Sequence, residues 1–76
     1  MVKRIISMNG ITDVTKMVTL AMVCDGDIII SSGRYAVDAK SILGVFSLDL
    51  TKGVTIEYPD ELTGTEFDEF MKTFEI

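Results

Sequence analysis

The pattern of apolar and polar positions divides the chain into seven segments, four of which are typical of strands. They are short and rich in β-branched residues, and the third and fourth alternate between the two faces of the strand. The turn Ser31-Ser32-Gly33 joins the second and third into a hairpin, and Pro59 ends the fourth because it has no amide hydrogen to donate to a sheet. The predicted strands cover Val2–Met8, Ile28–Ile30, Arg34–Asp38 and Val54–Tyr58.

The other three segments have apolar residues at helical spacing. In the first, Thr12 or Asp13 is expected to cap the helix, and Asp25-Gly26-Asp27 is expected to end it near Cys24. The second is a short helix from Ala39 to Leu48. In the third, Thr63 with Glu66 three residues later forms a predicted capping box. The apolar stripes of the first and third helices consist of Val14, Met17, Val18 and Ala21, and of Phe67, Phe70, Met71 and Phe74.

The resulting order, β-α-β-β-α-β-α, predicts an α+β domain with a sheet on one side and helices on the other. With 76 residues the chain has room for one domain, residues 1–76. The first six elements fit either a ferredoxin-like sheet or an open sandwich, and the pattern alone does not choose between them.

The composition excludes several classes of function. A net charge of −5 argues against binding to nucleic acid or to an anionic membrane surface, because both require clustered cations. A single cysteine and no histidine give neither a disulfide nor a zinc site, and Asp25-Gly26-Asp27 lacks the remaining ligands of a calcium loop. We therefore expect no metal or cofactor. The absence of a signal peptide or a long apolar segment predicts a cytoplasmic protein.

Two features of the composition leave alternatives open. Cys24 is either a small buried hydrophobic residue or a reactive thiol. The acidic residues near the C-terminus are either a solvated helix face or a docking surface for a basic partner; they are Asp60, Glu61, Glu66, Asp68, Glu69 and Glu75.

Residues 38–53 carry a more specific pattern. The pairs Lys40-Ser41, Gly44-Val45 and Ser47-Leu48, followed by the turn Thr51-Lys52-Gly53, resemble the HPr family, the small phosphocarriers of the bacterial sugar phosphotransferase system. Asn9-Gly10-Ile11 is similar to the entry of that family's active-site loop. The resemblance implies an open-faced β-sandwich, with a four-stranded antiparallel sheet and three helices packed on one face.

The family's active-site residues are not present at the matching positions. In the family the loop continues as His-x-Arg-Pro, and the histidine carries the phosphoryl group from Enzyme I to Enzyme II proteins. Here Thr12 occupies the histidine position, Val14 the arginine position and Thr15 the proline position. The chain contains no histidine elsewhere, so we expect neither a phosphohistidine carrier nor an enzyme.

The resemblance implies two further roles for the segment around Ser41. In Gram-positive relatives the matching serine is phosphorylated by a kinase, whereas a serine at this place can also simply cap the helix. The family docks its protein partners on the same helix, at positions matching Lys40, Ile42, Leu43 and Phe46. Because a short helix buries only one stripe, the last three residues are either interface or core. The leading hypothesis is a regulatory or binding module; the alternative is a vestigial or structural domain that self-associates.

Overall fold

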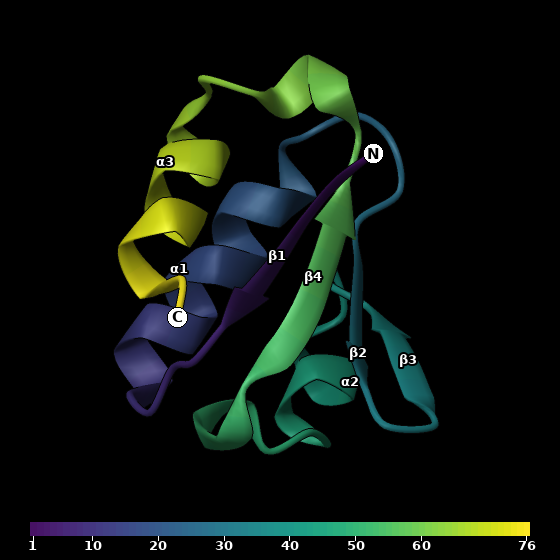
Figure 1. The fold of residues 1–76 in the computed structure, drawn as a ribbon, viewed down its shortest axis with the longest axis vertical. Coiled ribbons are helices and arrows are strands. Elements are labelled where there is room, and N and C mark those ends of the chain that lie inside the picture. The colour runs from purple at the N-terminus through teal and green to yellow at the C-terminus, as the bar shows by residue number, and fades with distance from the viewer.

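The computed structural model describes residues 1–76 and contains one sheet and three α-helices (Figure 1). The strands are β1 (Val2–Ile6), β2 (Ile29–Ser32), β3 (Tyr35–Asp38) and β4 (Val54–Tyr58). The helices are α1 (Ile11–Met22), α2 (Ile42–Phe46) and α3 (Glu66–Phe74), and two short 3-10 helices cover Leu50–Lys52 and Asp60–Leu62.

The strand order β1-β4-β2-β3, with every neighbouring pair antiparallel, decides between the two folds that the pattern left open. A ferredoxin-like sheet would place the first strand in the interior of the sheet, whereas β1 here is an edge strand that pairs with β4 alone among the four. The predicted α+β fold, in the order expected of the HPr-like sandwich, is confirmed.

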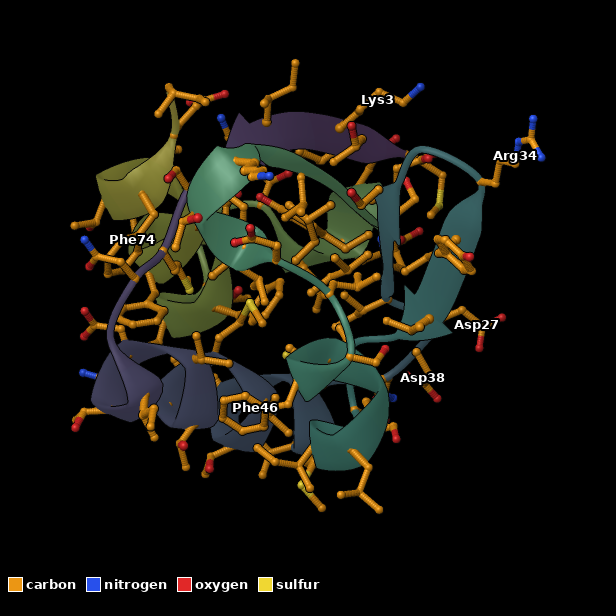
Figure 2. All side chains as sticks on the ribbon, turned by 90° about the horizontal axis from the view of Figure 1, so that it is seen from below. Lys3, Asp27, Arg34, Asp38, Phe46 and Phe74 are labelled. Atoms are coloured by element: carbon orange, nitrogen blue, oxygen red, sulfur yellow. The ribbon has the colours of Figure 1, made fainter.

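The core lies between the sheet and the helices, which pack on one face of it (Figure 2). The alternation in β4 shows this most clearly, because Val54, Ile56 and Tyr58 are buried while Thr55 and Glu57 are partly exposed. The predicted stripe of α1, Val14, Met17, Val18 and Ala21, is wholly buried. In α3, Phe67 and Met71 are buried, whereas Phe70 and Phe74 are only half-buried.

Several predicted boundaries were wrong in the strands and in α2. β1 ends at Ile6, because the amide of Met8 donates to Leu50 O instead of continuing the ladder. β2 extends to Ser32, so the tight turn lies at Gly33-Arg34, where Gly33 has a φ of 59°. α2 has five residues instead of the predicted ten.

The predicted N-caps of α1 and α3 were also wrong. Gly10 precedes α1 and no side chain caps it, so neither Thr12 nor Asp13 has that role. At α3 the cap is Thr65, whose hydroxyl accepts from the Asp68 amide. Thr63 instead ends the preceding 3-10 helix, donating its amide to Asp60 O.

Candidate functional site

Ser41 caps α2 and is exposed to solvent. Its Oγ accepts a hydrogen bond from the Gly44 amide at 3.2 Å, which satisfies one of the free donors of the first turn. Gly44 fits closely here, because a Cβ would lie 3.3 Å from Ser41 Oγ and 3.4 Å from Val37 Cβ. Of the two roles left open for Ser41, the cap is present, and the hydroxyl is also accessible.

The apolar residues of α2 divide between the core and the surface. Val45 is fully buried and Leu48, just beyond the helix, is half-buried against the core. Ile42, Leu43 and Phe46 are 38, 82 and 44% exposed, so of the two alternatives left open for them the structure favours the surface. Figure 2 shows the Phe46 ring on the side of α2 that is turned toward α1. We call these three residues the α2 surface.

Lys40, predicted to contact a partner, also has an internal contact. Its Nζ donates to Cys24 O at 2.9 Å, and its amide donates to Asp38 Oδ1 at 2.8 Å. The lysine thereby ties the segment before α2 to the end of α1. It is half-buried, unlike the α2 surface next to it.

Thr12, Val14 and Thr15 lie near the start of α1. Thr12 and Thr15 are exposed, while Val14 points into the core and is 5% exposed. The nearby cation on this helix, Lys16, has its Nζ 5.0 Å from the centre of the Phe70 ring. Val14, which the resemblance matches to the family's arginine, is therefore a core residue in this fold.

The pattern did not predict a buried polar network between the sheet and α3. Asp68, expected either on a solvated helix face or on a docking surface, is fully buried. Its carboxylate accepts hydrogen bonds from the Tyr58 hydroxyl, from Gly64 N at 2.9 Å and from Arg4 Nη2 at 3.4 Å. Arg4 also donates to Glu75 at 3.0 Å, so Asp68 and Glu75 are ion-paired rather than simply solvated.

The network shifts the ionisation of both buried acidic groups. Burial alone would raise the pKa of Asp68, but hydrogen bonds from Gly64 and Tyr58 and the charges of Arg4 and Lys72 outweigh it and hold that pKa below its ordinary value. Burial, followed by the hydrogen bond to Asp68, raises the pKa of Tyr58 to about 12. The network therefore holds Asp68 as a carboxylate and Tyr58 as a neutral phenol.

Cys24 is half-buried near the end of α1, and its Sγ donates to Leu20 O at 3.2 Å. Burial raises the pKa of the thiol, which reduces the thiolate fraction that a reactive cysteine needs. Of the two alternatives for Cys24, the structure supports the small hydrophobic residue.

A cavity of about 580 Å³ lies beside Cys24, between the end of α1 and the start of α3. In Figure 1 this region is at the top of the molecule and α2 is at the bottom. No group of three or more His, Cys, Asp or Glu side chains is placed to hold a metal ion. The helices are all too short to reach across a bilayer.

The comparisons with known proteins give one match. The family model PTS-HPr, described as the PTS HPr component phosphorylation site, matches residues 12–71, which include Ser41 and all of α2. No curated protein and no solved structure matches the chain.

Proposed function

The chain belongs to the HPr family of the phosphotransferase system, and we propose that it is a regulatory or binding member that does not carry phosphate on histidine. HPr proteins are phosphocarriers that act through protein partners and are not themselves enzymes. The proposal is that this chain keeps the partner-docking surface and works without the phosphohistidine. Like the family, it is proposed to act in the cytoplasm.

The absence of histidine supports the first half of this proposal. Thr12, at the matching position, could form only a phosphate ester, which does not readily pass its phosphoryl group onward. The buried Val14 supplies no cation to neutralise a phosphoryl group. We expect no label on the protein after incubation with Enzyme I and phosphoenolpyruvate. Acid-labile, base-stable phosphate on the intact protein would refute this half of the proposal.

The exposure of the α2 surface is the observation that carries the second half. Three large apolar side chains lie together on one five-residue helix, and such clusters on a small domain mark interaction sites. Their positions match those through which the family docks its partners. We therefore propose Ile42, Leu43 and Phe46 as the contact surface, with Lys40 at its edge.

The variant Phe46→Asp tests this surface. Because the ring is 44% exposed, the variant should keep the circular dichroism spectrum and melting temperature of a folded domain. Loss of an interface anchor typically costs about 2 kcal/mol or more, so capture of partners from an extract of the source cells should be lost. Tyr35→Asp is the matched control, since Tyr35 is an exposed aromatic residue on β3. An unfolded Phe46→Asp, or equal capture by both variants, would refute the docking surface.

Ser41 is proposed as a switch for the same surface. Phosphorylation would add about two negative charges beside Ile42 and Leu43, at a hydroxyl that is already exposed. We expect Ser41→Glu to change the affinity for the captured partner, with Ser41→Ala as the uncharged control. If both variants bind equally well, Ser41 acts only as the helix cap.

Self-association is the second candidate, favoured by the same exposed surface. A second copy of the chain, in place of a different protein, would also cover the apolar residues of the α2 surface. Sedimentation equilibrium distinguishes the two, because self-association gives a concentration-dependent mass that Phe46→Asp abolishes.

A further inference from the structure

The cavity between α1 and α3 has an apolar base. Leu62 and Phe67 are buried beneath it, Leu20 is half-buried, and Val23 stands at its edge with 81% of its surface exposed. Its volume of about 580 Å³ is within the range of sites that hold an amino-acid side chain or a small molecule. This hollow shares no residue with the α2 surface, and the Lys40 ammonium reaches its rim at Cys24 O.

Three carboxylates surround this apolar base. Asp25, Glu61 and Glu66 line the cavity, all three are exposed, and none takes part in an ion pair or a side-chain hydrogen bond of the protein. No lysine or arginine lines the cavity; the nearby ammonium of Lys40 is held on Cys24 O. The carboxylates therefore lack a cation within the molecule.

The two helix ends at the cavity have opposite partial charges. α1 points its negative end here and has no basic residue in its last turn, which favours a bound cation. α3 points its positive end here, but its first turn already carries Glu66, Asp68 and Glu69. The net charge of the rim is therefore negative, as is that of the whole protein at −5.

We propose that this cavity binds an arginine side chain, together with a flanking apolar residue, from a protein partner. The methylene groups of the arginine and the flanking residue would lie on Leu20, Val23, Leu62 and Phe67. The guanidinium would donate to the rim carboxylates, with Glu61 supplied by the 3-10 helix Asp60–Leu62 and Glu66 by the start of α3. The cavity is thus a second docking site, selected by positive charge, that shares no residue with the α2 surface.

Two short peptides test the site without a known partner. Acetyl-Leu-Arg-Leu-amide is titrated into the ¹⁵N-labelled protein, and the matched control carries citrulline, which has the shape of arginine without its charge. We expect saturable shifts in the amides of Val23, Cys24, Glu66 and Phe67, with the citrulline peptide binding about tenfold more weakly. Equal binding of the two peptides, or no saturable shift at these amides, would overturn the proposal.

Two double variants distinguish binding at this cavity from a general attraction of the peptide to the negatively charged protein. Glu61→Gln/Glu66→Gln should weaken binding of the arginine peptide about tenfold. Glu57→Gln/Glu69→Gln removes the same number of charges at positions that do not line the cavity, and should change the affinity for the arginine peptide by less than about twofold. Equal weakening by both pairs would mean that only net charge attracts the peptide. Circular dichroism verifies folding, and Asp25→Asn/Glu61→Gln replaces the first pair if loss of Glu66 disturbs α3.

Two single substitutions complete the test. Val23→Lys places a cation on the rim at the end of α1, where the helix dipole tolerates it, and should abolish binding of the arginine peptide. Phe46→Asp should leave peptide binding unchanged, since the α2 surface is separate. Loss of peptide binding in a Phe46→Asp variant that circular dichroism shows to be folded would move the site to the α2 surface and overturn this inference, independently of whether the proposed function is correct.

Discussion

Replacing Asp68 by asparagine tests how strongly the buried network holds α3 to the sheet. The side chain keeps its shape but exchanges one acceptor oxygen for an amide that donates. Both oxygens of Asp68 accept in the native protein, one from Tyr58 and Arg4 and the other from Gly64. The new amide must therefore face a donor, which leaves buried polar groups unsatisfied.

The size of the effect follows from these contacts. A buried donor without an acceptor costs about 1–3 kcal/mol, and removing one partner of a buried ion pair costs about 3–5 kcal/mol. Because the Arg4 side chain is 17% exposed and keeps its ion pair with Glu75, we expect Asp68→Asn to lower the unfolding free energy by about 3 kcal/mol. A chain of this length has a total stability of roughly 4–11 kcal/mol. The substitution should therefore remove a large part of it.

Urea denaturation followed by circular dichroism measures the loss. Glu69→Gln is the control, since it removes an exposed carboxylate of the same helix that pairs only with Lys72 and should cost less than about 0.5 kcal/mol. A loss below about 1 kcal/mol for Asp68→Asn would refute the reasoning.

The same network makes stability depend on pH. The pKa of Asp68 is lower in the folded protein than its ordinary value of about 3.9. Its stabilising contribution is therefore complete above about pH 4 and is lost as the pH falls through the folded pKa. The difference in unfolding free energy between the native protein and Asp68→Asn should narrow below about pH 4. A difference independent of pH would contradict the ionised state of Asp68.

Three further outcomes follow from the contacts and burial of single side chains. Phe67→Ala should lower the unfolding free energy by about 3–5 kcal/mol because the ring is fully buried, and Phe70→Ala should lower it distinctly less because that ring is half-buried. Equal shifts of the denaturation midpoint for the two variants would contradict the orientation of α3. In a Tyr35→Phe background, the phenolate absorbance of Tyr58 should rise near pH 12. Stability should fall above about pH 10, because between about pH 10 and 12 the phenol of Tyr58 loses its proton in the unfolded chain but not in the folded one. A titration midpoint near pH 10 in the folded protein would mean that the ring is not held as described. Ser41→Ala should lower the unfolding free energy by about 0.5–2 kcal/mol through loss of the cap, and an unchanged urea midpoint would show that the cap contributes nothing.

The apolar pattern was sufficient for the element order and for most of the core, because strand and helix periods are local properties. It failed at element ends, where tertiary contacts decide. The amide of Met8, for example, pairs with Leu50, more than forty positions away, rather than with a strand neighbour. The strand order came from the resemblance, since periodicity does not distinguish one edge strand from another.

The position of Arg4 in β1 is a sequence signal for the buried network. Arg4 has the same parity in β1 as the buried Ile6, so it points toward the helices, where an isolated cation would be costly. On the opposite strand Tyr58 also points inward. An inward arginine needs a buried carboxylate, but which of six acidic residues supplies it depends on how α3 is placed. The cavity depends in the same way on the approach of α1 to α3, and no local pattern indicates it.

The place of β1 at the edge of the sheet has a consequence for how the protein folds. β1 pairs within the sheet only with β4, and Arg4 and Tyr58 are 54 positions apart, while Arg4 and Glu75 are 71 apart. The β2–β3 hairpin, in contrast, closes within a few residues. Contacts between distant positions must overcome loop-closure entropy before they contribute, so they slow folding. We expect the hairpin to form early and the first strand of the chain to be among the last elements to join the sheet.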